Sequence, residues 1–229
     1  MQWRRELSWN PSDLQWRIAV LFMVGSFLFA LGSFPPYSQL MDARVVGITF
    51  VVGSIFFTTA GYSQLVQIVN DPLKGDGRRL RLWAWQPHKL LWWAALIQFI
   101  GTLFFNVNTI RALADTLTTV EEANRLVWAP DFLGCIAFLV ASHFFWLAVC
   151  HRLWRVISDD PDWWGSLLNY VGSIFFMLSA LGSFTLDTGQ ELNITIVNLG
   201  TFVGAVCFYV GAYLLLPPYG VAARSRSDV

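Results

Sequence analysis

Five polar side chains that could form hydrogen bonds or carry a proton lie within long apolar stretches of the sequence. They are Gln98, Asn106, Asn108, His143 and Asn169. A polar group in an apolar helix needs a partner, so such residues either join neighbouring helices or line a cavity. We interpret the five as candidates to line a pocket, with interhelical hydrogen bonding as the alternative.

His143 is the one candidate that titrates near neutral pH, so it could hold a proton or ligate a haem iron. His151 follows on the same stretch, roughly 80° around a helix, so the two rings could not ligate one haem from opposite faces. His88 lies at the end of another stretch. The pattern favours a structural histidine and predicts no cofactor, with haem as a minor alternative.

Three charged residues lie at matching positions at the ends of apolar stretches. Arg44, Arg125 and Glu191 each precede a glycine of a repeated phrase by nine residues. They could pair with one another and set the charge at the outer mouth of a pocket. The alternative is that each side chain extends separately to water.

Other familiar chemistry has no support in the sequence. Cys135, Cys150 and Cys207 lie in or at the end of apolar stretches and lack the spacing of a zinc site or a disulfide framework. The phosphate-binding GxxxxGK[ST], HExxH and GxSxG motifs are absent from the sequence. We therefore expect no catalytic residue, no metal site and no enzymatic activity.

The elements that must position these residues are membrane-spanning helices. The chain is 55% hydrophobic and only 13% charged, whereas soluble domains are about 25% charged. A helix needs roughly 20 apolar residues to cross a bilayer. Six such runs lie at about 16–35, 45–69, 91–110, 131–154, 164–185 and 193–216. The prediction is an all-α polytopic membrane protein, with residues 1–229 as one transmembrane domain in contact with the lipid bilayer.

The basic residues predict the orientation of these spans. Cytoplasmic loops are rich in Lys and Arg, and three arginines (Arg44, Arg111 and Arg125) fall on one predicted side. The other twelve basic residues fall on the opposite side: Arg4, Arg5, Arg17, Lys74, Arg78, Arg79, Arg81, Lys89, Arg152, Arg155, Arg224 and Arg226. Both termini should thus be cytoplasmic, with 218–229 a flexible tail. The basic loop 74–81 suits anionic lipid rather than nucleic acid.

A short phrase recurs in every apolar run: a glycine, a small residue, two apolar residues and usually Phe. Small residues let membrane helices approach closely, so these glycines are candidate helix-packing positions. They are Gly25, Gly53, Gly101, Gly134, Gly172 and Gly200. The spacing predicts three tandem parallel two-helix repeats at about 10–70, 86–155 and 160–217, in a pseudo-three-fold arrangement.

The odd-numbered runs share two further features. Each follows an X-Pro pair that we interpret as a helix start, at Asn10-Pro11, Gln86-Pro87 and Asp160-Pro161. Each also carries a tryptophan nine residues before its glycine, which predicts an anchor at the cytoplasmic interface. These are Trp16, Trp92 and Trp163.

The repeated phrase resembles the YrhK-like domain of bacterial membrane proteins. The passages that carry the resemblance are 24–29, 171–176 and 198–202. It implies a multi-pass protein of the bacterial inner (plasma) membrane, and the family brings no established activity, cofactor or site residue with it.

Three functions remain open from the sequence. The first is a non-enzymatic pathway or binding pocket for an ion or small molecule within the bundle. The second is a structural or accessory subunit of a larger membrane complex or homo-oligomer, with a solidly packed axis. The third is a haem-bearing redox protein.

Overall fold

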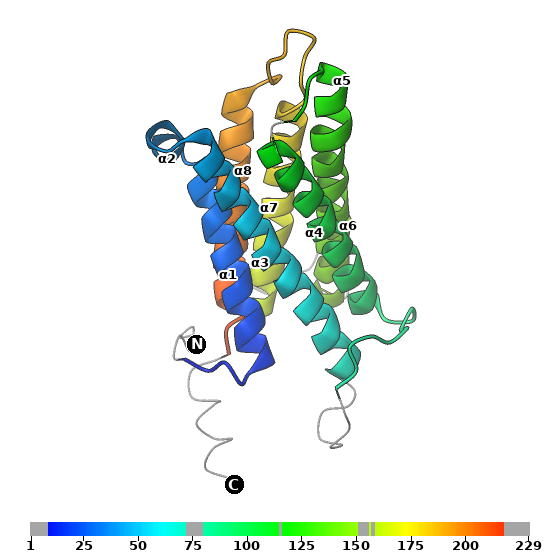
Figure 1. The fold of residues 1–229 in the computed structure, drawn as a ribbon. Coiled ribbons are helices and arrows are strands. Elements are labelled where there is room, and N and C mark those ends of the chain that lie inside the picture. Colours follow the sequence, from blue (N-terminus) through cyan, green and yellow to red (C-terminus); the bar gives the residue numbers. More distant parts are fainter. Residues whose placement is uncertain (1–8, 72–79, 115, 151–155, 157–158, 218–229) are drawn as a thin grey trace.

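The computed structural model describes residues 9–71, 80–114, 116–150, 156 and 159–217. Within them, six helices are long and apolar enough to cross a membrane (Figure 1). Five are α1 (Leu14–Ser33), α3 (Ala43–Asn70), α4 (Leu90–Ala114), α7 (Pro161–Gly182) and α8 (Ile194–Leu214). The other runs from Val120 to Cys150 and consists of α5 (Val120–Ala123), the π-helix η2 (Asn124–Trp128) and α6 (Ala129–Cys150). A short helix, α2 (Pro35–Leu40), joins α1 to α3.

The helix starts agree with the predicted X-Pro positions in one case of three. Asp160 caps α7 by accepting a hydrogen bond from the Asp162 N–H, and Pro161 occupies the first turn. Asp13, rather than Asn10, caps α1, and α4 begins at Leu90, beyond Pro87. The predictions at Pro11 and Pro87 were wrong because these prolines lie in turns that precede the helices.

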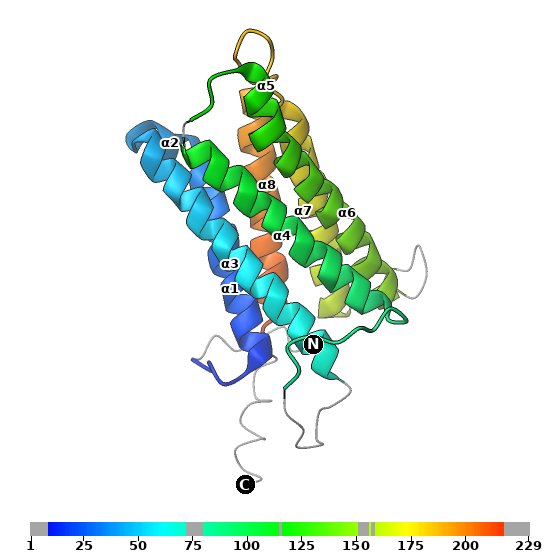
Figure 2. The same ribbon diagram turned by 45° about the vertical axis from the view of Figure 1, so that its right-hand side comes forward.

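The long helices form a closed ring. Each packs against two others in the order α1, α3, α4, α6, α7 and α8, and α8 packs against α1 (Figures 1 and 2). We call the end where α1 and α7 finish the outer end, and the end where they begin the inner end. Long helices that follow one another in the chain run antiparallel, and we refer to α1/α3, α4/α6 and α7/α8 as the three helix pairs.

Six phenylalanine rings fill the middle of this ring, and we call them the six-Phe core. One set of three comprises Phe29, Phe105 and Phe176, whose ring centroids are 6.2–6.4 Å apart. The other set comprises Phe57, Phe138 and Phe208, at 5.6–6.4 Å. Within each helix pair, the two rings are 5.0–5.4 Å apart. All six rings are buried, so the axis of the bundle is packed at this level.

Each core ring packs over a glycine of the partner helix in its pair. A Cβ on Gly101 would lie 2.7 Å from the Phe138 ring, and one on Gly134 would lie 3.0 Å from Phe105. The same exchange joins α1 to α3 through Gly25 and Gly53, and α7 to α8 through Gly172 and Gly204. Glycine is therefore needed where the ring of one helix approaches the backbone of the next.

In α8, the glycine of this exchange is Gly204 and not the predicted Gly200. A Cβ on Gly204 would meet the Phe176 ring at 2.9 Å, whereas one on Gly200 would meet the backbone of α7 at Phe175 and Ser179. Gly204 begins its own copy of the phrase, which ends in Phe208. With this register, Thr195 rather than Glu191 takes the position equivalent to Arg44 and Arg125.

The three repeated tryptophans lie inside the inner end of the bundle. Trp16, Trp92 and Trp163 are all buried, whereas an interfacial belt would leave them facing lipid headgroups. Trp92 donates a hydrogen bond from Nε1 to the Ala84 carbonyl and packs against Trp85 at 4.8 Å. Each of the three belongs to an apolar cluster with residues of a neighbouring segment at this end of the bundle.

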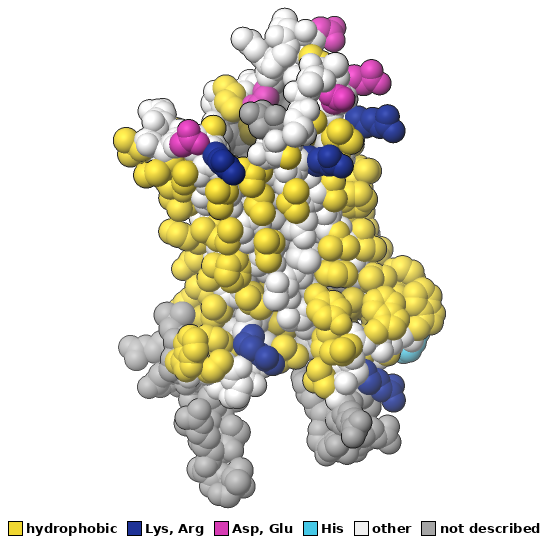
Figure 3. All heavy atoms as spheres, in the orientation of Figure 1, with side chains coloured by type: hydrophobic (Ala, Val, Ile, Leu, Met, Phe, Trp, Pro, Cys, Tyr) yellow, Lys and Arg dark blue, Asp and Glu magenta, His cyan; other side chains and the backbone are white. Residues whose placement is uncertain are grey.

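The outer surface of the bundle matches a bilayer. On the face shown in Figure 3, hydrophobic side chains cover the middle, and charged side chains gather at the two ends. Ile55, Val107 and Leu199 are about half exposed on these helices. The chain is a multi-pass membrane protein. Of the twelve basic residues that set the predicted orientation, Arg17, Arg81 and Lys89 are described, and the others, with the tail 218–229, lie outside the described residues.

Candidate functional site

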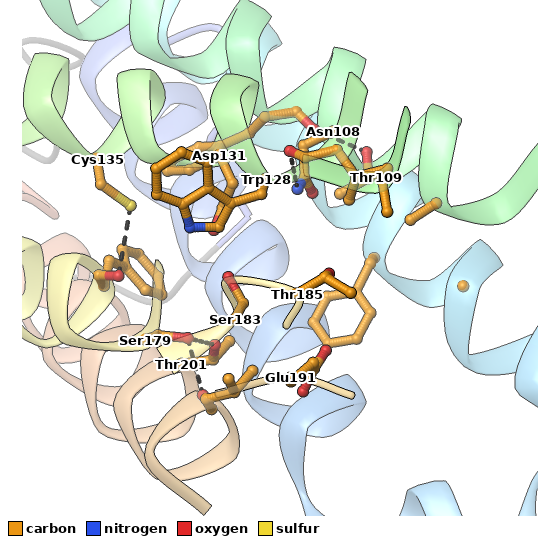
Figure 4. A pocket seen from close by; sticks show the side chains of 18 of the residues that line it. Asn108, Thr109, Trp128, Asp131, Cys135, Ser179, Ser183, Thr185, Glu191 and Thr201 are labelled. Atoms are coloured by element: carbon orange, nitrogen blue, oxygen red, sulfur yellow. Dashed lines mark hydrogen bonds between the residues drawn. The ribbon is translucent and has the colours of Figure 1, made fainter. Parts of the chain in front are cut away.

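A pocket of about 410 Å³ opens at the outer end of the bundle, directly above the six-Phe core. Its floor is the set Phe29, Phe105 and Phe176, and Phe50 and Trp128 add apolar walls. The polar side chains that line it come from α4, α6, α7, α8 and the α7–α8 loop: Asn108, Thr109, Asp131, Ser179, Ser183, Thr185, Glu191 and Thr201 (Figure 4). A volume of several hundred Å³ with an apolar lining and a few polar groups is typical of small-molecule sites.

The wall formed by α7 and α8 is held by short hydrogen bonds. Ser179 Oγ donates to the Val197 carbonyl at 2.9 Å and lies 2.7 Å from Thr201 Oγ1. Ser183 Oγ donates to the Ala180 carbonyl at 3.0 Å, one turn earlier on α7. This row of hydroxyls is therefore fixed in place, with Ser183 nearest the outer end of α7.

The opposite wall depends on the π-helix η2. Pro130 lacks the N–H that an α-helix requires, and a π-turn just before it lets the helix continue without a break. Asn108 of α4 donates from Nδ2 to the Val127 carbonyl at 3.1 Å and so ties α4 to this segment. The helix thus begins at Val120, and the predicted start of the span at residue 131 was wrong.

Trp128 and the α7–α8 loop are positioned by contacts to the same segment. Trp128 Nε1 donates to the Ala180 carbonyl at 2.8 Å, and its ring stacks on Phe132 at 5.1 Å. Asn124 accepts from the Thr185 N–H at 2.9 Å and donates to the Thr185 carbonyl at 2.8 Å. Thr185 also pairs with Glu191 in an isolated β-bridge, so η2 fixes the loop that carries Glu191 into the pocket.

Among the described residues, both charged groups that line the pocket are acidic. Asp131 is partly buried on α6, and Glu191 lies on the exposed α7–α8 loop. Partial burial raises the pKa of the Glu191 carboxyl above its ordinary value. Arg44 and Arg125 are exposed and are not among the lining residues, and neither makes an ion pair with Glu191 in the described part of the chain. Of the predicted mouth charges, the structure thus brings only Glu191 to the pocket.

Two of the predicted pocket residues lie below the six-Phe core rather than above it. Gln98 and Asn169 line a cavity of about 20 Å³ together with Phe22 and Gln64. The Gln64 Oε1 atom is buried without a hydrogen-bond partner. A space of this size can hold one water molecule, which would satisfy the amide groups.

The inner end of the bundle has a hollow of about 840 Å³, and its charged lining residues carry both signs. They are Asp71, Lys89 and Asp162. The hollow, the small cavity and the outer pocket all draw residues from several helices of the ring, and the six-Phe core lies between the outer pocket and the other two.

Of the three remaining predicted residues, one lines the outer pocket and two lie apart from it. Asn108 lines it, but Asn106 donates to Thr58 Oγ1 at 2.8 Å and so joins α4 to α3. The His143 ring lies 5.9 Å from Tyr170 and lines neither the pocket nor the small cavity. Asp131 lines the pocket although it was not among the predicted lining residues, and its sequence signal is an acid that directly follows Pro130 at the edge of an apolar run.

The described residues contain no cluster of three or more His, Cys, Asp or Glu that could hold a metal ion. The pocket instead combines fixed hydroxyl and amide groups, two acids and an aromatic floor, which suits reversible binding. Comparison of the chain with protein-family models, with curated protein sequences and with solved structures finds no match.

Proposed function

We propose that this protein binds a small molecule in its outer pocket, on the side of the membrane away from the cytoplasm, and catalyses no reaction. The observation that carries the proposal is a pocket of about 410 Å³ with fixed polar walls above a closed floor. The rings of the floor pack against glycines of the partner helices. Movement of these rings out of the floor would break the closest contacts between the helices. A binding protein of the bacterial inner membrane, as the YrhK-like resemblance implies, fits these features.

The second candidate function is a closed pathway for a small solute. It is favoured by the hollow at the inner end, which lies on the other side of the six-Phe core from the outer pocket. In this alternative, the core is the barrier that would have to open. A structural or accessory role has less support, because the bundle is not packed solidly at its outer end.

We also infer that the three helix pairs are copies of one unit arranged around an axis along the membrane normal. Support comes from the Gly–Phe exchange, which recurs in all three pairs, and from the similar ring distances within each set of three. The cavity below the core adds to this, since Phe22, Gln98 and Asn169 each precede their glycine by three residues.

A thiol reporter in the pocket wall tests the proposed binding site. Ser183→Cys is nearly isosteric and, in a chain whose three cysteines are replaced, introduces a single thiol. In detergent, we expect it to react with N-ethylmaleimide but at least about tenfold more slowly with a maleimide carried by a bulky polymer, because the pocket admits only drug-sized molecules.

The matched control is Ser38→Cys on α2, an exposed position that should react with both reagents. Rates are compared as the ratio of small to bulky reagent at the two positions. Equal ratios at the two positions, or no reaction of Ser183→Cys with N-ethylmaleimide, would contradict an accessible pocket of limited size.

A further inference from the structure

We propose that the outer pocket takes a small organic cation, an ammonium or amidinium compound with an apolar body. This inference rests on the proposed binding function and names the chemical class of its ligand. Three features of the lining support it: the sign of its charges, the position of Asp131 and the apolar floor.

The charges of the described residues that line the pocket have one sign. Asp131 and Glu191 are both acids, and none of the described lysines and arginines lines the pocket. The described arginines at this end, Arg44, Arg111 and Arg125, are exposed. Two carboxylates in a hollow with low-dielectric walls raise the local concentration of cations and repel anions.

Asp131 has no partner that explains its position. The structure records neither a hydrogen bond nor an ion pair for its carboxyl group among the described residues, although the residue is partly buried in the pocket wall. Stabilisation of a helix N-terminus does not account for it, because the helix begins at Val120, and Thr119 caps that start. A carboxylate in such surroundings is costly unless a positive group pairs with it.

The rest of the lining suits an organic body better than a bare metal ion. Phe29, Phe105 and Phe176 form an apolar floor, and aromatic rings attract ammonium groups placed over their faces. Figure 4 shows Asp131 and Glu191 on different sides of the hollow, and the described residues hold no cluster of three metal-ligating side chains. The volume of about 410 Å³ is that of roughly a dozen water molecules, more than a desolvated ion would fill.

The test uses the Ser183→Cys reporter with two methanethiosulfonate reagents of similar size. One carries a trimethylammonium group, and the other carries a sulfonate. We expect the ratio of cation to anion rates at Ser183→Cys to exceed the ratio at the exposed Ser38→Cys by about tenfold, as Coulomb attraction in a partly desolvated site predicts. Benzyltrimethylammonium should slow modification of Ser183→Cys and leave Ser38→Cys unaffected.

Substitutions that remove one charge at a time show which carboxylate causes the preference for the cationic reagent. Asp131→Asn should reduce the rate ratio at least about threefold, whereas Asp187→Asn, at an exposed loop position outside the lining, should leave it unchanged. Glu191→Gln, on the same loop, provides a second lining variant if Asp131→Asn fails to fold.

Each outcome decides between the two proposals. If Ser183→Cys reacts with N-ethylmaleimide but shows no charge preference, the pocket stands and the organic cation is overturned. The same conclusion follows if the preference survives both lining substitutions. If Ser183→Cys fails to react with N-ethylmaleimide, the proposed binding site itself is overturned.

Discussion

Phe138→Ala is expected to lower the free energy of unfolding by about 3 kcal/mol, measured by denaturant titration in mixed micelles. The ring is 1% exposed and contacts three other core rings at 5.0–6.4 Å. It also fills the space over Gly101. The loss comes from packing contacts, because the separated helices of a membrane protein already lie in apolar surroundings.

The matched control is Phe27→Ala on α1. Phe27 is 55% exposed on the surface that faces lipid, so its truncation should cost less than about 0.5 kcal/mol. Equal losses for the two variants would mean that the six-Phe core does not hold the bundle together, and the fixed floor of the pocket would lose its support.

Gly200→Ala is expected to destabilise the bundle by about 2 kcal/mol, although alanine is the better helix former. The new Cβ would lie 2.7 Å from the Phe175 carbonyl oxygen and 2.9 Å from the Ser179 backbone nitrogen. Both atoms belong to the backbone of α7, so the two helices would have to separate. That movement would also strain the hydrogen bonds from Ser179 to α8 in the pocket wall.

Gly61→Ala in α3 is the control, and for it we expect a change of stability in the opposite direction. Its Cβ would meet no atom closer than 3.6 Å, so the helix propensity of alanine should raise the unfolding free energy by up to about 1 kcal/mol. Thermal unfolding in detergent, followed by circular dichroism, compares the two variants. A stabilised Gly200→Ala, or a destabilised Gly61→Ala, would contradict the helix spacing described here.

The sequence predicted the six membrane-crossing helices because their signal is simple. Each is a long apolar run with few charges, and in lipid such a run is stable as a membrane-spanning helix. Helix boundaries were less accurate, as Pro130 illustrates. A proline at the edge of an apolar run favours a helix start, but the π-turn of η2 absorbs it within a continuous helix.

The candidate site was harder to predict. The sequence position of a residue gives its depth in the membrane more reliably than the neighbour that its side chain faces. Asn106 and Asn108 lie at nearly the same depth in the membrane. Because an α-helix turns by about 100° per residue, their side chains point to nearly opposite faces of α4. Asn106 therefore bonds to α3, whereas Asn108 lines the pocket. Glu191 reaches the pocket through a loop whose position depends on Asn124, 61 residues away in the sequence. Contacts of this kind have no local signature.

The register of α8 shows how a short motif can mislead. Gly200 and Gly204 both begin an apolar phrase, and the first was interpreted as the sixth copy because Thr201 resembles the small residue of the others. The core ring Phe208 follows Gly204 by four residues, as in the other five helices, and this distance identifies the packing glycine.

The central claim is that the pocket is open to the outer side of the membrane and that the six-Phe core closes the bundle below it. Cysteine labelling from one side of the membrane, at positions above and below the core, tests this claim most directly. Asn169→Cys lies below the core on α7, and Ser183→Cys lies above the core at the residue that follows the end of α7. With the membrane-impermeant trimethylammonium reagent added only to the outer side of oriented vesicles, Ser183→Cys should react and Asn169→Cys should stay unmodified. Modification of Asn169→Cys from that side at a comparable rate, or an unreactive Ser183→Cys, would contradict the account.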